Sequence, residues 1–180
     1  YNKCNASFKG LHIIQTNHIP MARGLGSSSA CIIGGLLGAN VLMGNPFSST
    51  EILNVATEIE GHPDNVAPAL LGGLVSSCIQ DTHAYSVKKD IDTNLSFATF
   101  IPSFELLTEK SRASLPEQIP FKDAVYNLSR TALSQSAFCD GNLELLPIVT
   151  QDKLHQTYRL PLIQDGDTIF SLAKKWGALA

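Results

Sequence analysis

The sequence has 180 residues, of which 44% are hydrophobic and 16% are charged, and its net charge at pH 7 is −3. This length allows one large domain or two small ones, and the composition is typical of a globular protein rather than a disordered one. The small negative charge argues against a nucleic-acid partner, and no apolar run reaches the ~18 residues of a membrane-spanning helix. With no secretion signal at the start, a cytoplasmic location is expected.

The four cysteines are Cys4, Cys31, Cys78 and Cys139, and they stand far apart in the chain. Zinc sites and redox disulfides use closely spaced pairs, which this sequence lacks. We therefore expect reduced, partly buried thiols.

Two apolar segments open the chain. Residues 11–18 mix β-branched residues in short alternation and are followed by Pro20, so they are predicted to form a strand. Residues 28–43 are small and apolar almost without interruption, which is too long for a buried strand, and Gly44 offers a C-terminal stop. These residues are predicted to form a buried helix.

A second helix is predicted between Ser48 and Gly61. Ser48 precedes Glu51 by the spacing of a capping box, in which each side chain binds the other residue's backbone amide. Gly61 is a suitable terminator. One helical face carries the apolar residues that we expect to face the core, namely Ile52, Val55, Ala56 and Ile59.

Two strands are predicted next, at residues 72–80 and 84–89. The polar stretch at residues 88–94 is the best candidate for a domain boundary. We therefore place one domain at residues 1–90 and a second at residues 91–180.

The second domain is predicted to contain one strand, at residues 95–102, and then a short helical or turn segment that ends at Pro116. Helices are expected at residues 121–139, 143–154 and 167–175. The first of these carries apolar residues at helical spacing, namely Ala124, Val125, Leu128, Ala132 and Leu133. Strands interspersed with helices on both sides of the boundary predict an α+β protein.

A loop rich in glycine and serine leads into the helix at residues 28–43. Gly24 and Gly26 let the backbone approach a ligand and adopt the positive φ values that turn successive amides toward one point. A helix N-terminus leaves its first N–H groups unpaired and carries about half a positive charge, which favours phosphate. The loop is predicted to bind phosphate. The alternative is that a serine simply caps the helix.

The stretch EGHPDNVAPALLGG begins at Glu60. A glutamate at a helix end can bind a divalent cation, and a cluster such as His62, Asp64 and Asn65 can orient a small polar substrate beside it. Alternatively, Glu60 is a solvated charge, His62 a turn residue and Asp64 a cap.

Two arginines in the second half, Arg112 and Arg159, are candidates for binding a carboxylate. A guanidinium group presents a planar fork of donors that matches a carboxylate. The alternative is that both arginines are surface charges.

Several segments resemble the GHMP kinases, the superfamily that includes galactokinase, mevalonate kinase and homoserine kinase. PMARGLGSSS resembles the second GHMP motif, and EGHPDNVAPALLGG resembles the homoserine kinases in particular. TEKSR and QDKLHQTYRLPLI resemble later segments of that family. The resemblance implies the α+β GHMP kinase fold, with an N-terminal α+β domain and a C-terminal ferredoxin-like domain, both incomplete here, and with ATP and substrate bound in the cleft between them.

The resemblance also implies an activity, the ATP-dependent phosphorylation of the side-chain hydroxyl of L-homoserine in threonine biosynthesis, with Mg²⁺ as cofactor. The implied ATP-binding loop comprises Pro20, Met21, Ala22, Arg23, Gly24, Leu25, Gly26, Ser27, Ser28 and Ser29. The implied magnesium ligands are Ser28 and Glu60, and the implied catalytic set is Ser28, Glu60, Asn65 and Arg112. The implied substrate contacts are His62, Asp64, Asn65, Thr108, Arg112 and Arg159. The expected partners are therefore small molecules rather than nucleic acid or membrane, and a homodimer is left open.

The first and third GHMP motifs are not found in the sequence. The chain opens without a methionine, inside strand-like residues, and stops just after a predicted helix. We therefore expect a piece of a longer protein, and we expect the 180 residues alone to be inactive because both motifs border the implied cleft.

Two other functions stay open. The chain could belong to a GHMP kinase for a different hydroxyl substrate, although two arginines suited to an amino-acid carboxylate argue against a sugar. It could also belong to a relative that binds nucleotide but has lost catalysis.

Overall fold

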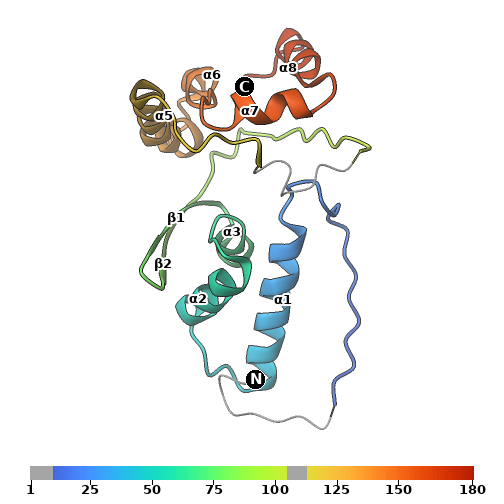
Figure 1. Ribbon diagram of the computed structural model, residues 1–180. Helices are drawn as coiled ribbons and strands as arrows, with labels where there is room; N and C mark the ends of the chain where they lie inside the picture. Colours follow the sequence, from blue (N-terminus) through green and yellow to red (C-terminus); the bar gives the residue numbers. More distant parts are fainter. Residues whose placement is uncertain (1–9, 105–112) are drawn as a thin grey trace. The chain divides into compact units, whose positions relative to one another are not determined.

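The computed structural model describes residues 10–104 and 113–180 (Figure 1). The chain divides into two compact units, Tyr1–Lys89 and Asp90–Ala180, which are described separately below. Together the helices and strands make an α+β protein, as predicted. Within the described ranges, no helix combines the length and the apolar character needed to cross a bilayer.

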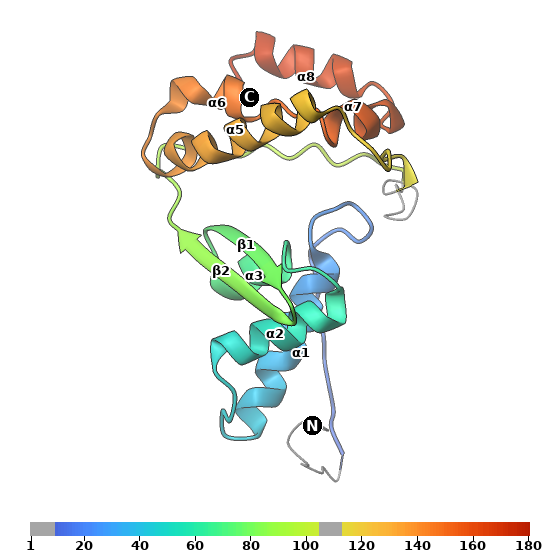
Figure 2. The ribbon, with the colours of Figure 1, turned by 60° about the vertical axis from the view of Figure 1, so that its left-hand side comes forward.

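Unit 1 consists of three helices and a hairpin. Its elements are α1 (Ser27–Leu42), α2 (Ser49–Glu60), α3 (Val66–Leu71), β1 (Leu74–Gln80) and β2 (His83–Lys89). The helices α2 and α3 contact α1 as well as the hairpin (Figure 2). Six buried residues form the core between these elements, namely Ile33, Leu53, Ala56, Val66, Ala67 and Ala84.

The capping box of α2 is confirmed. Ser48 accepts a hydrogen bond from the backbone N–H of Glu51 through its hydroxyl, and the Glu51 carboxylate accepts one from the backbone N–H of Ser48. Gly61 ends the helix with φ 87°, a left-handed conformation that glycine adopts without steric cost. The core face predicted for α2 is only partly right. Ile59 is exposed, whereas Leu53, which is not among the predicted core residues, is buried.

The hairpin confirms the two strands predicted before the domain boundary. β1 and β2 pair antiparallel from Leu74 opposite Lys89 to Gln80 opposite His83. Asp81 occupies the turn with φ 57°, which an aspartate tolerates better than most residues.

Three predictions for unit 1 are wrong. Residues 11–18 form no strand, because a strand needs a partner for its backbone groups and the described part of the chain supplies none to this segment. Helix α1 forms as predicted but is not buried throughout; Ile33 faces the core, whereas Val41 is 63% exposed. Cys31 and Cys78 are exposed rather than partly buried.

All of the regular elements within the described residues of unit 2 are helical. Its elements are α5 (Phe121–Cys139), the 3₁₀ turn η2 (Leu143–Leu145), α6 (Leu146–Val149), α7 (Gln156–Arg159), the 3₁₀ turn η3 (Leu160–Leu162) and α8 (Gly166–Lys175). A small core forms around Ala137, Leu146 and Val149, and Leu95 and Phe138 pack against it. The segment before α5 is tied to this core, because Asp92 donates its backbone N–H to the carbonyl of Phe138.

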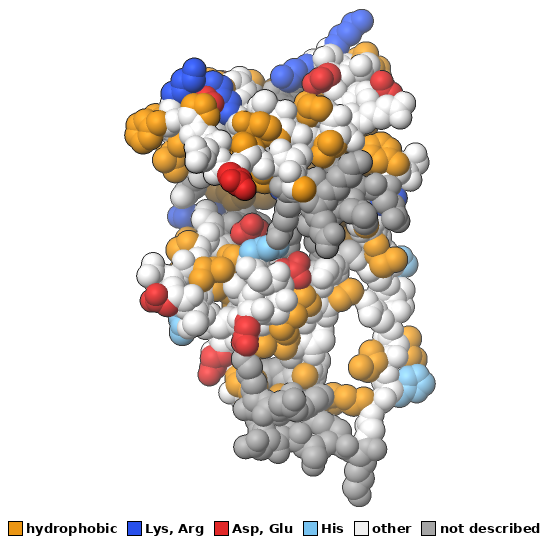
Figure 3. All heavy atoms as spheres, viewed as in Figure 1, with side chains coloured by type: hydrophobic (Ala, Val, Ile, Leu, Met, Phe, Trp, Pro, Cys, Tyr) orange, Lys and Arg blue, Asp and Glu red, His pale blue; other side chains and the backbone are white. Residues whose placement is uncertain are grey.

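The helices predicted at residues 121–139 and 167–175 are confirmed, with one correction of the packing. The predicted apolar face of α5 includes Leu128, which is 70% exposed, while Ala137 near the helix end is buried. Figure 3 shows such exposed apolar side chains in orange on both units.

Three other predictions for unit 2 need correction. Residues 95–102 form no strand, since no described segment pairs with them. The helix predicted at residues 143–154 is reduced to η2 and α6, because the chain turns at Thr150 and Asp152. Helix α7 and η3 occupy residues that the sequence pattern left as a connection. The ferredoxin-like assignment of this unit stays a prediction.

Candidate functional site

The glycine–serine loop of unit 1 has the backbone conformation that its sequence predicts. Gly24 has φ 70° and Gly26 has φ 72°, and Ala22 is also left-handed with φ 55°. A left-handed alanine costs about 1–2 kcal/mol, and backbone strain of this kind is typical of ligand-binding loops. The loop therefore keeps a shape that its residues would not adopt by local preference alone.

The start of α1 is left without a side-chain cap. Gly26 is the N-cap residue, no side chain accepts from the first turn in the manner of a cap, and the first helical hydrogen bond runs from Ala30 to the Gly26 carbonyl. The backbone N–H groups of Ser27, Ser28 and Ser29 precede that bond, so they have no partner within the helix. This geometry excludes the alternative in which a serine caps the helix, and it favours an anion at this position.

Two serine hydroxyls of this first turn bind one carboxylate at the end of α2. Ser28 Oγ donates to Glu60 Oε2 at 3.2 Å, and Ser29 Oγ donates to Glu60 Oε1 at 3.0 Å. Ser29 is only 1% exposed, whereas Ser28 is exposed. The buried Ser29 thus links α1 to α2 through its bond to Glu60. The exposed Ser28 hydroxyl lies beside the same carboxylate at the surface.

Two asparagines lie beside the loop. Asn17 donates its side-chain N–H to Ser27 Oγ at 2.8 Å and accepts the backbone N–H of Ile19 at 3.0 Å. A Cβ on Gly26 would lie 3.7 Å from Oδ1 of Asn65, so the Asn65 side chain packs directly on the loop. The structure therefore brings Asn65 to the glycine–serine loop, while the side chain of Asn65 does not cap α3.

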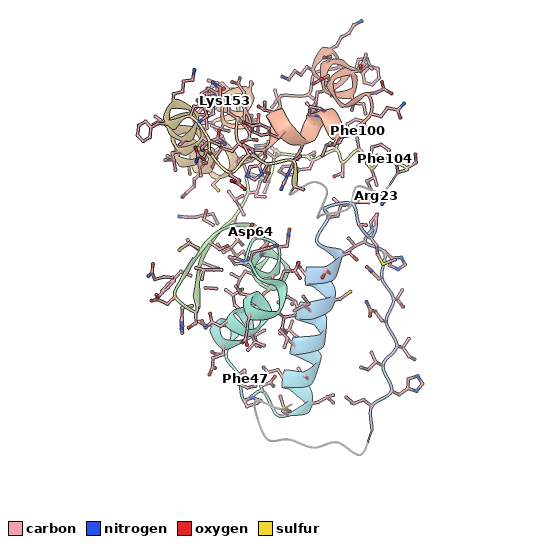
Figure 4. The ribbon with its side chains drawn as sticks, in the orientation of Figure 1. Arg23, Phe47, Asp64, Phe100, Phe104 and Lys153 are labelled. Atoms are coloured by element: carbon pink, nitrogen blue, oxygen red, sulfur yellow. The ribbon has the colours of Figure 1, made fainter. Side chains whose placement is uncertain are left out.

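The other residues predicted in the second motif lie between α2 and α3. His62 is half-buried, and its Nδ1 is buried with no hydrogen-bond partner among the described residues. Asp64 is exposed, and Pro63 between them is buried. Figure 4 shows Asp64 and Arg23 at the end of unit 1 where α1 begins, with Phe47 at the opposite end. Arg23 donates to the carbonyls of Met21 and Ala22, so its guanidinium folds back on its own loop.

The predicted substrate residues of unit 2 are only partly described. Thr108 and Arg112 lie outside the described residues. Arg159 is the last residue of α7, and its Nε is buried without a hydrogen-bond partner in the described part of the chain. A buried N–H that lacks a partner costs about 1–3 kcal/mol, a cost that a hydrogen-bond acceptor would relieve.

The donor set at Ser28 and Glu60 suits magnesium better than a tightly held transition metal. No three His, Cys, Asp or Glu side chains gather anywhere in residues 10–104 or 113–180. Magnesium is usually held by one or two carboxylates together with substrate phosphates, and it keeps several waters. One carboxylate, one exposed hydroxyl and an uncapped helix end for phosphate fit that description.

The comparisons with known proteins agree with these features. Residues 1–73 match the family described as the GHMP kinases N terminal domain. Residues 1–73 belong to the GHMP kinases. This span includes the whole of the glycine–serine loop, Glu60 and Asn65.

Several relatives of this chain are named homoserine kinase. A homoserine kinase of Clostridium beijerinckii is 46% identical over 181 residues, covering 100% of this chain and 61% of the relative. A homoserine kinase of Caldicellulosiruptor saccharolyticus is 49% identical over 170 residues, covering 94% of this chain and 55% of the relative. The crystal structure of a homoserine kinase from Cytophaga hutchinsonii matches with a TM-score of 0.81 at 29% identity, covering 91% of this chain and 53% of that one. The chain thus spans between half and two thirds of the length of these relatives.

Sequence reasoning missed Asn17 and the contact of Ser29 with Glu60 in this GHMP kinase domain. Asn17 lies in the segment predicted as a strand, and nothing in its spacing indicates that its amide reaches Ser27. The signal for Ser29 is present but ambiguous, because three consecutive serines do not reveal which of them faces inward.

Proposed function

We propose that the full-length protein transfers the γ-phosphoryl group of ATP to the side-chain hydroxyl of L-homoserine. The P–O bond to the β-phosphate breaks, a new P–O bond to the homoserine oxygen forms, and the hydroxyl proton is lost, giving ADP and O-phospho-L-homoserine. The observation that carries the proposal is the uncapped start of α1 with Ser28 and Ser29 hydrogen-bonded to Glu60. The names of the relatives support the choice of homoserine.

The loop from Pro20 to Ser29 would bind the triphosphate. Backbone N–H groups of the first turn of α1 would donate to phosphate oxygens, and the helix dipole would favour their negative charge. Gly24 and Gly26 let the backbone close around the phosphates because no Cβ stands in the way. This part of the proposal needs no side chain other than the serines.

Ser28 and Glu60 would hold magnesium. When bound, the ion supplies positive charge that offsets the negative charge on the transferring phosphoryl group. The hydrogen bond between the two side chains orients the carboxylate toward the start of α1.

Several side chains would contact the amino-acid substrate. Asn65, His62 and Asp64 would orient the polar groups of homoserine, and the unpartnered Nδ1 of His62 is a candidate donor or acceptor. Arg112 and Arg159 would bind the carboxylate, with Thr108 beside them. Catalysis then rests on positioning and charge neutralisation, and no general base is assigned. The proposal includes a cytoplasmic location and small-molecule partners only.

The test is a coupled ADP-release assay on the purified full-length protein with ATP and magnesium. The hydroxyl acceptors to compare are L-homoserine, L-serine, L-threonine, mevalonate and galactose. Turnover with L-homoserine at least about a hundredfold above the others, judged by kcat/KM, supports the proposal. Preference for another acceptor would make the protein a different GHMP kinase, and ATP binding without any turnover would make it a nucleotide-binding relative.

A further inference from the structure

The turn before α7 is held by the carboxylate of Asp152, which lies in the segment QDKLHQTYRLPLI and has no role among the site residues above. Asp152 accepts four hydrogen bonds. The donors are the side-chain amide of Asn127 at 2.5 Å and the backbone N–H groups of Leu154 at 2.9 Å, His155 at 2.6 Å and Gln156 at 2.5 Å. A carboxylate with acceptors in several directions is suited to collect such donors.

The bonds to Asp152 replace the N-cap hydrogen bond that α7 lacks. His155 is the N-cap residue of α7 and makes no side-chain cap hydrogen bond. Asp152 instead accepts the N–H groups of His155 and Gln156, and the helical bond from Arg159 N to His155 O follows at 2.9 Å. The position of Arg159 therefore depends on a turn in which three backbone amides converge on Asp152.

The same turn is attached to α5. Lys153 donates its backbone N–H to Asn127 Oδ1 at 3.0 Å, and its ammonium group lies 3.3 Å from Asp123 and over the Tyr126 ring at 4.4 Å. Tyr126 also donates its hydroxyl to Gln151 Oε1 at 2.5 Å. Contacts on both sides of Asp152 thus fix it to the longest helix of the unit.

The carboxylate is charged at neutral pH. Burial raises the pKa of the Asp152 carboxyl, but the hydrogen bonds from Gln156, Asn127, Leu154 and His155 outweigh burial, so the pKa lies below its ordinary value. The backbone donors that surround it favour the ionised form.

We propose that Asp152 is a positioning residue that holds α7 on α5 and thereby places the guanidinium of Arg159, whose Nε is buried without a partner among the described residues, for an anionic group of the substrate. This inference rests on the proposed function in that the anionic group is taken to be the carboxylate of homoserine. The positioning itself is a property of unit 2 and can be measured without turnover.

The first experiment compares steady-state kinetics of the full-length protein and its Asp152→Asn variant. Asparagine has nearly the shape of aspartate, but its side-chain NH₂ group would face the N–H donors that bind the Asp152 carboxylate. We expect the KM for homoserine to rise about tenfold and the KM for ATP to stay within about twofold, because only the carboxylate-binding arginine is displaced. Asp167→Asn, an exposed aspartate in the first turn of α8, is the matched control and should leave both KM values unchanged.

A double-variant cycle separates positioning from general destabilisation. If Asp152 acts through Arg159, Asp152→Asn should add nothing to the KM for homoserine in an Arg159→Ala background. Effects that multiply in the double variant would overturn the proposal. An unchanged KM in Asp152→Asn, or an equal rise for both substrates, would overturn it as well.

A second readout keeps the test independent of activity. The Nε–H signal of Arg159, assigned by its loss in Arg159→Ala, should exchange with solvent at least about tenfold faster in Asp152→Asn. Unchanged exchange overturns the positioning even in a protein that does not phosphorylate homoserine. If Asp152→Asn does not fold, Asn127→Ala removes one of the four hydrogen bonds to Asp152, together with the bond from Lys153, and should accelerate that exchange about threefold. An unchanged rate would again overturn the proposal.

Discussion

Ser28 and Glu60, which lie 32 positions apart in the chain, are joined by a hydrogen bond of 3.2 Å at the start of α1. The same carboxylate binds the buried Ser29 through its other oxygen. Since one serine is exposed and the other is enclosed, substitution of the two should have different consequences, which gives the first prediction.

Ser28→Ala is expected to lower kcat about a hundredfold, equivalent to ~3 kcal/mol, with little change in the KM for homoserine, because the hydroxyl is proposed to act on metal and phosphate. Ser29→Ala should instead lower the free energy of unfolding by ~1–2 kcal/mol, because a buried hydrogen bond is lost. Steady-state kinetics and urea unfolding measure the two effects. Wild-type kinetics in Ser28→Ala would remove Ser28 from the site.

Alanine at Gly26 and at Gly34 should act in opposite directions. Gly26 has φ 72°, so Gly26→Ala is expected to lower the free energy of unfolding by about 1 kcal/mol. Gly26→Ala should also weaken ATP binding, because the backbone amides after residue 26 would turn away from the proposed phosphate position. Gly34 lies in α1 with open space around its Cβ position, so Gly34→Ala should raise stability by about 1 kcal/mol. Equal effects of the two variants in urea unfolding would contradict the assigned loop conformation.

Arg112→Leu should raise the KM for homoserine strongly while ATP binding stays nearly intact, because losing a buried charged partner costs ~2–5 kcal/mol. Lys175→Leu, at the end of α8, serves as the control and should change neither constant. Isothermal titration with ATP provides the second measurement. A loss of ATP affinity in Arg112→Leu would place this residue on the nucleotide side.

Glu51 should make the stability of unit 1 depend on pH. Hydrogen bonds from the side chain and backbone of Ser48 lower the pKa of the Glu51 carboxyl. A lowered pKa in the folded state adds stability above the unfolded pKa, and this stability is lost as the pH falls through the folded value. The melting temperature of Glu51→Gln should therefore lie below that of the wild type at pH 7, and the gap should close below about pH 4. A gap that stays constant over this range would contradict the capping role of the charge.

Local signals account for what could be predicted from the sequence. The capping box at Ser48, the left-handed glycines of the loop and the hairpin strands depend on neighbours a few residues away, so their patterns are decisive. Phosphate binding by the glycine–serine loop is predicted from the loop's own residues, whereas the family resemblance implies Ser28 and Glu60 as ligands of one magnesium ion. The pairing is present as a hydrogen bond, and its role as a magnesium site stays a prediction.

Long-range partners account for the failures. Residues 11–18 have the composition of a strand, but composition does not supply the neighbouring strand that would satisfy the backbone. The spacing of Val125 and Leu128 predicts a core face for α5, yet that face is exposed and the contacts of the helix concentrate near Ala137. Asp152 could not be identified because three of its four donors are backbone amides, which every residue except proline possesses.

Every side chain that shapes the phosphate loop, from Asn17 to Asn65, precedes the core residue Ala84 and the end of unit 1 at Lys89. Since synthesis proceeds from the N-terminus and compact units generally fold as they emerge, unit 1 can acquire its shape on the ribosome before synthesis of unit 2 is complete. Cellular ATP would then act on a nascent chain as well as on a finished enzyme, and binding at this stage would protect the half-made product from proteases.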